Sequence, residues 1–202
     1  MTWPLRRRVP RERTPAELQA LAERKRLDNL RLFAVHVVGP DGRRRDPQVS
    51  VSPAVLTIRL PYATPSLNDL VGHHPARKSR VRHAWASRLA YAIDLAAPAR
   101  AWVPHLFPTL ASRVDWVCPT NRPAVQVLRL VPSRRNFFDR DNKWGGCKPL
   151  IDALVAGDFL PNDREDDIDQ RVDQNVSRDG LDWTVINIDA RPLEARTPLE
   201  AC

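Results

Sequence analysis

Residues 124–142 decide how this chain folds, and they read AVQVLRLVPSRRNFFDRDN. The stretch begins with apolar and polar side chains in alternation from Ala124 to Val131, a period of two that predicts a β-strand. It ends with Asp139 and Asp141, two carboxylates one residue apart. Because successive side chains of an extended segment point to opposite faces, we expect these two acids to share one edge and to repel each other.

A metal ion would remove that repulsion. Mg²⁺ prefers oxygen ligands, and it is commonly held by one or two carboxylates while it keeps several of its waters. A third acid, Asp163, follows in the run Pro161-Asn162-Asp163. The sequence therefore predicts a Mg²⁺ site, with Mn²⁺ as an alternative ion, built from Asp139, Asp141 and Asp163.

Outward from this stretch, hydrophobic spacing predicts an α/β fold. Strands are expected at residues 54–60, 168–176 and 183–188, the last two as a hairpin around a turn at Gly180. Helices are expected at residues 85–97 and 148–155, where apolar residues recur at helical spacing. The basic residues between 73 and 82 are expected in a loop. The order strand, helix, strand, helix, hairpin predicts a single domain over residues 52–190, with a small mixed sheet and flanking helices.

The two ends of the chain are expected to lie outside that domain. Residues 1–50 are interpreted as an N-terminal basic extension, and residues 191–202 as a C-terminal tail. Residues 1–13 contain five arginines among prolines, which predicts a disordered arm. The run Thr14-Pro15-Ala16-Glu17 has the pattern of a capping box and predicts a helix over residues 15–31.

The net charge of +8 is unevenly distributed. Lys and Arg exceed Asp and Glu by 6 over residues 1–50 and by 10 over residues 51–150, whereas the acids are in excess by 8 over residues 151–202. A basic body with a localised acidic segment is typical of an enzyme that holds a polyanion and keeps carboxylates for a metal. No apolar run reaches the roughly 18 residues of a membrane span, so no membrane partner is expected. The three cysteines lack CxxC spacing, which favours a reducing, cytoplasmic compartment.

The motifs resemble those of the RusA-type Holliday junction resolvases, the crossover junction endodeoxyribonucleases of bacteria and their phages. The family pattern is D-x-D-N, a lysine on the next helix, a D-A-L-like end, a glycine and an acidic pair. The loop 65–68, which reads PSLN, also resembles the family's P-S-x-N loop, so the resemblance covers about residues 55–190. The matching positions in this chain are Asp139-Arg140-Asp141-Asn142, Lys148, Asp152-Ala153-Leu154, Gly157 and Asn162-Asp163.

The resemblance implies a metal-dependent endonuclease that resolves four-way DNA junctions by paired symmetric nicks, in recombination and repair. It implies a bacterial or phage-encoded homodimer, since a two-fold protein suits a two-fold substrate. Asp139, Asp141 and Asp163 would be catalytic as metal ligands, and Lys148 would stabilise charge on the phosphate. Asn142 would orient a ligand or cap the following helix, and Asp152 would support the ligands. The residues expected to contact DNA are Arg77, Lys78, Arg80, Arg82, Arg134, Arg135, Arg140 and Asn68.

Two positions depart from the family pattern. The interval from Asp141 to Lys148 is longer than in the shortest members, so we expect a looser entry into the helix, with Lys143 as an alternative to Lys148. The acidic pair is reduced to Asn162-Asp163, which leaves the second carboxylate. Two other functions stay open: a non-catalytic nucleic-acid-binding protein that retains the fold, and a structure-specific nuclease that acts on forks or flaps.

Overall fold

The computed structural model describes residues 14, 37–38, 41–70, 75–97, 109–164 and 166–191, without the side chains of residues 69 and 75–77. The chain divides into two compact units, Met1–Phe33 and Ala34–Cys202, and the helices and strands described belong to the second. The predicted arm at 1–13, the predicted helix at 15–31 and the tail beyond residue 191 lie outside the described residues.

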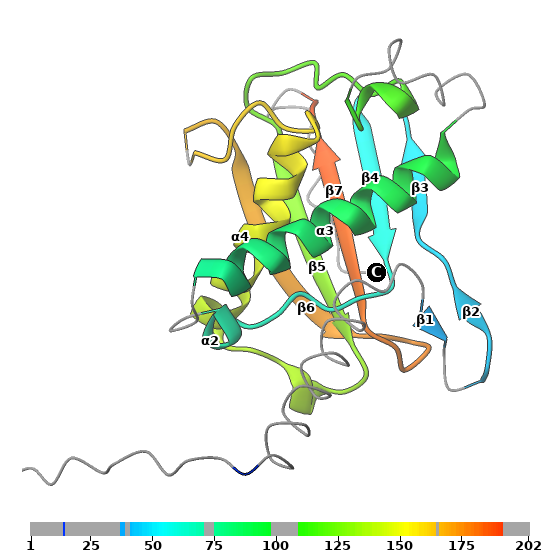
Figure 1. The fold of residues 1–202 in the computed structure, drawn as a ribbon. Helices are drawn as coiled ribbons and strands as arrows, with labels where there is room; N and C mark the ends of the chain where they lie inside the picture. The colour runs from blue at the N-terminus through cyan, green and yellow to red at the C-terminus, as the bar shows by residue number, and fades with distance from the viewer. Residues whose placement is uncertain are drawn as a thin grey trace, which may run out of the picture. The chain divides into compact units, whose positions relative to one another are not determined.

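A five-stranded mixed sheet in the order β3-β4-β7-β5-β6 forms the centre of the second unit (Figure 1). β5 and β6 run parallel, whereas the other neighbouring strands run antiparallel. This confirms the predicted α/β fold with a small mixed sheet. The strands are β3 (Gln48–Val51), β4 (Val55–Leu60), β5 (Ala124–Val131), β6 (Asp169–Val176) and β7 (Trp183–Asp189), and a separate two-stranded sheet pairs β1 (Val37–Val38) with β2 (Arg44–Arg45).

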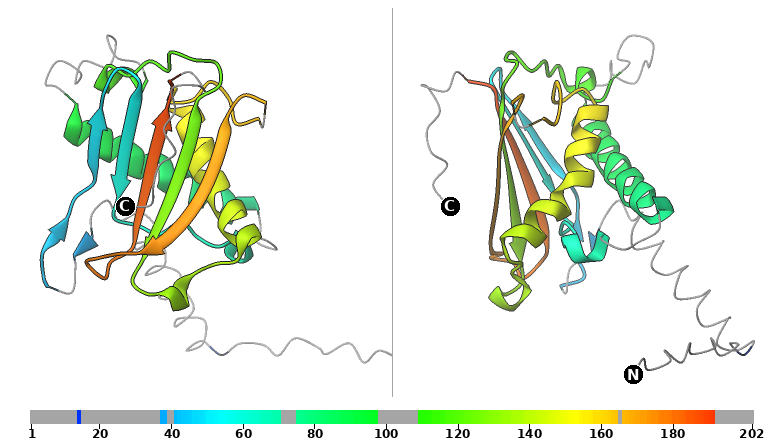
Figure 2. Two further views of the ribbon diagram at one scale, coloured as in Figure 1. Left: turned by 180° about the vertical axis from the view of Figure 1, so that it is seen from behind. Right: turned by 90° about the vertical axis from the view of Figure 1, so that its left-hand side faces the viewer.

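The described helices lie against one face of the sheet, as the edge-on view shows (Figure 2). Alternate residues of β4 (Leu56, Ile58 and Leu60) are fully buried on that face, and Trp85 and Leu89 of a long helix are buried as well. The core therefore lies between the sheet and its helices. The helices are α2 (Leu67–Leu70), α3 (Pro75–Ala96) and α4 (Arg140–Ala156), with short 3-10 helices η2 (Ser112–Val114) and η3 (Arg134–Asn136).

The predicted hairpin of the last two strands is wrong. β5 lies between β6 and β7, pairing with β6 in parallel and with β7 antiparallel. The turn at Gly180 exists, with φ at +67°, but a turn signal is local and does not show whether the strands it joins are neighbours. Strand composition explains the order, because β6 is polar and lies at the edge, whereas β7 buries Thr184, Ile186 and Ile188 and lies inside the sheet.

The predicted basic loop before the first long helix is also corrected. α3 begins at Pro75, ten residues before the predicted start at 85. Proline is well tolerated in the first turn of a helix, where its missing N–H would have no partner. Arg77, Lys78, Arg80 and Arg82 therefore lie on a helix. The exposed Lys78, Arg80 and Arg82 interrupt the apolar spacing in these turns, and His73 and His74 lie outside the described residues.

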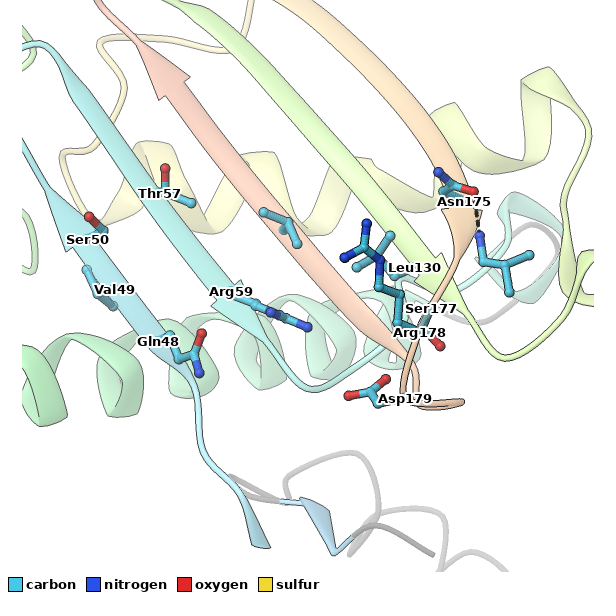
Figure 3. A pocket seen from close by; sticks show the side chains of 12 residues that line it. Gln48, Val49, Ser50, Thr57, Arg59, Leu130, Asn175, Ser177, Arg178 and Asp179 are labelled. Atoms are coloured by element: carbon cyan, nitrogen blue, oxygen red, sulfur yellow. Dashed lines mark hydrogen bonds between the residues drawn. The ribbon is translucent and has the colours of Figure 1, made fainter. Parts of the chain in front are cut away.

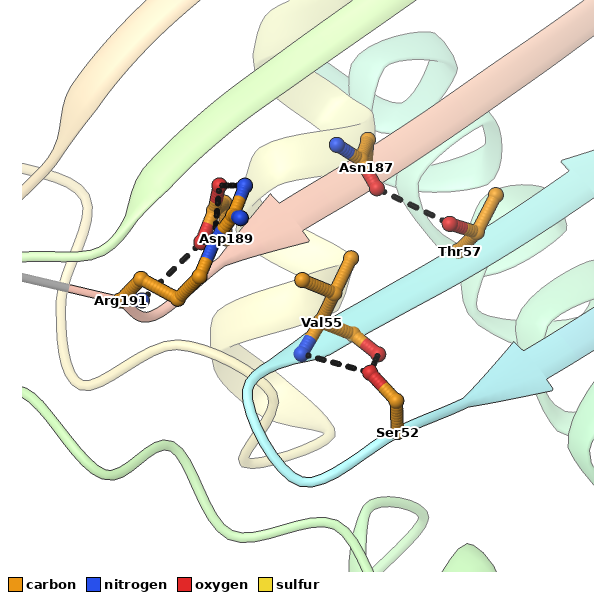
Figure 4. A network of polar contacts seen from close by, with 6 residues as sticks. All are labelled: Ser52, Val55, Thr57, Asn187, Asp189 and Arg191. Carbon is orange, nitrogen blue, oxygen red and sulfur yellow. Dashed lines mark hydrogen bonds and ion pairs between the residues drawn. The ribbon is translucent and has the colours of Figure 1, made fainter. Parts of the chain in front are cut away.

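Polar pairs tie β4 to β7 at the end of the sheet where β4 starts (Figure 4). Thr57 donates a hydrogen bond to the Asn187 side chain across the two strands at 2.9 Å. Arg191 donates from Nε and Nη2 to the Asp189 carboxylate, at 2.9 and 2.6 Å, just after β7 ends. The Thr57–Asn187 bond joins paired residues of β4 and β7, whereas the Arg191–Asp189 pair lies at the end of β7. Among the described residues, no helix has the length and apolar content that crossing a membrane requires.

Candidate functional site

The predicted acidic motif forms the start of α4. Asp139 is the N-cap residue, and its carboxylate accepts hydrogen bonds from the Asn142 backbone N–H at 2.9 Å and from Asn142 Nδ2 at 2.8 Å. The residue that caps the helix is thus Asp139, which corrects the predicted capping role of Asn142. Asn142 instead orients the Asp139 carboxylate, since its backbone N–H and its side-chain amide both donate to that group.

The two acids do not lie on one edge of an extended segment, which corrects the first step of the sequence argument. Asp139 has an extended backbone, with φ at −64° and ψ at 172°, but α4 already begins at Arg140. Asp141 therefore belongs to the first helical turn, where its charge is favourable beside the positive end of the helix dipole. Both carboxylates lie on residues exposed to solvent.

α4 continues without interruption from Arg140 to Ala156, so the predicted looser entry between Trp144 and Cys147 is wrong. The seven residues from Asp141 to Lys148 make almost two turns, which places the two side chains on one stripe of the helix about 10 Å apart along its axis. Gly145 and Asp152 belong to the same stripe. The longer interval thus keeps Lys148 in phase with Asp141.

Two glycines allow the P-S-x-N-like loop to pack directly on α4. A Cβ on Gly146 would lie 1.8 Å from the backbone oxygen of Pro65, and a Cβ on Gly145 would lie 2.4 Å from a methyl group of Leu67. Real Cβ atoms do not come this close to another heavy atom. The loop then reaches the acidic motif, because the Asn68 backbone N–H donates to Asn142 Oδ1 at 3.2 Å.

Two side chains from the sheet hold the backbone that precedes Asp139. Gln174 of β6 pairs with the Phe138 backbone in both directions: Phe138 N–H donates to Gln174 Oε1 at 3.0 Å, and Gln174 Nε2 donates to the Phe138 oxygen. Arg129 of β5 donates to the Asn136 oxygen at 2.7 Å, and its guanidinium lies 3.9 Å from the centroid of the Phe138 ring. The entry to α4 is therefore fixed by β5 and β6.

Lys148 lies among carboxylates on the exposed side of α4. Its Nζ is 2.9 Å from Asp152 Oδ1, one turn further along, and it forms an ion pair with Asp163 from the loop that follows the helix. The Asp163 backbone N–H donates to the Asn162 side chain at 2.8 Å. Asn162 therefore still orients the Asp163 segment where the family pattern has an acid.

The structure does not bring Asp163 together with Asp139 and Asp141. Asp163 contacts Lys148, which lies two helical turns beyond Asp141. Over the described residues, no three His, Cys, Asp or Glu side chains lie close enough together to hold a metal ion. The carboxylates form two groups instead: the Asp139 and Asp141 pair at the start of α4, and the Asp152 and Asp163 pair around Lys148.

The residues expected to contact DNA lie on three elements around α4. Lys78, Arg80 and Arg82 are exposed on α3, where Arg77 also lies without a described side chain. Arg134 and Arg135 are exposed in η3, and Arg140 is exposed at the first position of α4. The Asn68 residue is exposed next to Asn142. Lys78 and Arg82 line a cavity of about 520 Å³ together with Lys148.

A second cavity, of about 750 Å³, lies on the other face of the sheet and contains none of the predicted site residues (Figure 3). Arg59 lies over the Trp183 ring there, 4.2 Å from its centroid, and the Trp183 indole N–H donates to Asp179 at 2.9 Å. Arg59 is thus engaged with a ring of the sheet. The residues that line this cavity include one carboxylate, that of Asp179, and no lysine.

Cys147 marks the point where α4 enters the core. Its side chain is fully buried, and burial raises the pKa of its thiol to about 11. A neutral buried thiol behaves as a small apolar group. Cys147 therefore supports packing behind Lys148 and lacks the thiolate character of a reactive cysteine.

Sequence reasoning missed several residues that position this site: Gln174, Arg129, Leu67 and the Gly145-Gly146 pair. The glycine pair carried a usable signal, because adjacent glycines within a helix often mark a close backbone approach. Gln174 gave no signal, since a glutamine on a polar strand usually faces solvent. Its role depends on the parallel pairing of β5 with β6.

Neither a scan of protein-family models nor a search of curated proteins finds a match to this chain.

Proposed function

We propose that this protein is a metal-dependent endonuclease that acts as a homodimer in the cytoplasm of a bacterium or phage-infected cell. It would resolve four-way DNA junctions by paired nicks during recombination and repair. One observation carries the proposal: Asp141 and Lys148 share a stripe of α4, and Lys78 and Arg82 line the same cavity as Lys148. Hydrolysis of a phosphodiester requires relief of developing negative charge and a surface that holds a polyanion, and this side of α4 offers both.

The Asp139 and Asp141 pair fits a divalent ion better than the predicted three-aspartate set does. Mg²⁺ in nucleotide sites is often bound by one or two carboxylates together with substrate oxygens and water. The Asn142 hydrogen bonds fix the Asp139 carboxylate, as partners of metal ligands commonly do. When bound, Mg²⁺ or Mn²⁺ would supply an activated water and neutralise charge on the phosphate.

Lys148 would act on the phosphate from the same side. Its contacts with Asp152 and Asp163 hold Nζ in place and leave the lysine exposed for a further hydrogen bond. An ammonium donates three hydrogen bonds, so two carboxylates leave capacity for one phosphate oxygen. Asp163 is thereby proposed to position Lys148. The exposed Arg134, Arg135 and Arg140 would contact neighbouring phosphates and make binding sensitive to salt.

A second candidate function is non-catalytic binding of branched DNA. The observation that favours it is the separation of Asp163 from the Asp139 and Asp141 pair. This candidate keeps the cationic surface of α3 and assigns the acids to capping and ion pairing.

The test is cleavage of a synthetic four-way junction by the purified full chain, with Mg²⁺, with Mn²⁺ and with EDTA. We expect paired nicks that require the ion, and slower cleavage of a fork, a flap and a linear duplex. Asp141→Asn should lower the rate roughly a hundredfold or more while junction binding is retained. The matched control is Asp158→Asn, because Asp158 is exposed beyond α4 and its left-handed backbone also suits asparagine.

Each outcome decides between the candidates. Binding without cleavage in either ion would overturn the nuclease and favour the second candidate. Equal cleavage by wild type and Asp141→Asn would remove the acidic pair from the mechanism. Faster cleavage of forks or flaps would keep the chemistry but replace the junction as substrate.

A further inference from the structure

The cavity beside Lys148 combines an apolar floor with a cationic rim. It lies between α2, α3 and α4, and we call it the α3–α4 groove. Leu67, Leu70 and Pro149 provide the apolar part. Gly145 also lines the groove, and the absence of a side chain there lets Leu67 pack against α4.

The rim is positive. Lys78 and Arg82 are four residues apart on α3, so they share one face of that helix. Lys148 faces them from α4, and the acid in the groove, Asp152, is paired with Lys148 at 2.9 Å. Three cations and one anion leave the groove with a net charge of +2. Lys78 and Arg82 are exposed to solvent.

We propose that the α3–α4 groove binds one unstacked nucleotide of the DNA strand to be cut. The base lies against Leu67, Leu70 and Pro149, and its phosphate lies between Lys78 and Arg82. Enzymes that act on nucleic acids can bind a base, out of its stack, between apolar side chains. Proteins that bind single strands hold the phosphate backbone in a cationic groove. The apolar floor and the cationic rim match the two parts of a nucleotide, and a volume of about 520 Å³ is typical of a small-molecule pocket.

This inference rests on the proposed function, because the groove shares Lys148 with the proposed cleavage site. The inference also gives a physical reason why the protein would prefer branched DNA to duplex DNA. Unstacking a base costs least where pairing is already broken, and the branch point of a junction offers such positions. The groove would therefore favour the branch point without reading a base sequence.

The test measures binding in EDTA, so that it is independent of cleavage. The probes are fluorescent decathymidylate and a decamer of abasic deoxyribose phosphates, which carry the same charge. We expect the full chain to bind decathymidylate about tenfold more tightly. Ser79 lies in the groove between the two cations, so Ser79→Phe should fill the groove and abolish the difference. Ser87→Phe, on the exposed side of α3, should leave the difference unchanged.

Further variants keep the test decisive. Should Ser79→Phe lower the melting temperature, Ser79→Leu serves in its place. Lys78→Gln with Arg82→Gln should weaken both probes while the preference for bases persists. The half-exposed Trp144 is the competing platform for a base, and Trp144→Ala tests it.

Three outcomes would each overturn the inference. The full chain could bind the two probes equally, or it could bind neither. The preference for bases could also be lost in Trp144→Ala and kept in Ser79→Phe. A preference for bases in a protein that never cleaves DNA would overturn the proposed nuclease and leave the groove intact.

Discussion

The two halves of α4 are held in place by different means. Residues 147–156 are fixed by their own burial, since Cys147, Leu150 and Leu154 are fully buried against the sheet. Residues 140–146 are exposed or partly exposed except for Gly146, and they are fixed by contacts from elsewhere: the Pro65 loop on Gly146, and the pairing of Gln174 with the segment before the helix. Of the proposed site, Asp141 lies on the half that is held by outside contacts, whereas Lys148 lies on the half that is held by burial.

That difference explains the composition of the helix. Gly145, Gly146 and Pro149 cost helix propensity of roughly 1 kcal/mol for each glycine and about 3 kcal/mol for the proline. Such residues persist where tertiary packing or function compensates for them. Here the glycines admit the loop, and Pro149 lines the groove. In the first half, the two glycines thus combine weak helix propensity with support from the loop that packs on them.

The largest effect on stability is expected in the second half. Leu150→Ala leaves a cavity at a fully buried position, so the free energy of unfolding should fall by about 2–5 kcal/mol. The activity of the protein that remains folded should change little. Urea unfolding followed by circular dichroism measures the first quantity, and cleavage at low temperature measures the second. A loss below about 1 kcal/mol would show that this half is not fixed by burial.

Gly146→Ala should give the next largest effect, in the first half. The added Cβ would meet the backbone oxygen of Pro65 at 1.8 Å, and backbone yields less readily than a side chain. We expect a loss of about 1–3 kcal/mol in unfolding free energy. Gly145→Ala should cost less because it meets the Leu67 side chain, and adding Leu67→Ala should restore part of the loss. Equal losses in the two alanine variants would contradict loop packing through Gly146.

Gln174→Leu should alter the site more than the fold. It removes both hydrogen bonds to Phe138, so the segment that presents Asp139 should loosen and kcat should fall about tenfold to a hundredfold. Hydrogen exchange at the Phe138 amide should speed up, which is a readout independent of cleavage. The matched control is Gln170→Leu, four residues earlier on the same face of β6. Comparable effects of the two variants would show that Gln174 has no special positioning role.

The second half of α4 could be predicted from the sequence, and the first half could not. Ile151, Leu154 and their neighbours recur at helical spacing, whereas residues 140–146 offer glycines and charged side chains. The strands at 55–60 and 124–131 were predicted well because β4 and β5 alternate buried and exposed residues. The positions of β6 and β7 in the sheet could not be predicted from the turn that joins them. They depend on β5, which pairs with both strands and separates them. The acids and the lysine of the proposed site stand out in the sequence, whereas the Gln174 contact depends on strand pairing alone.

The smallest expected effect concerns Cys147, the first buried residue of the second half. Burial raises the pKa of its thiol to about 11, above the ordinary value of 9.0 that we expect in the unfolded chain. Between about pH 9 and pH 11 the unfolded state therefore loses a proton that the folded state keeps, and folding stability falls as pH rises. Cys147→Ala removes this titration, so its free energy of unfolding should fall less steeply over that range than that of wild type. The cavity left by alanine shifts the whole curve but not its slope, so the difference in slope isolates the thiol. Parallel curves for the two proteins would mean that water reaches Cys147, and the boundary between the two halves would then lie deeper in the helix, toward Leu150.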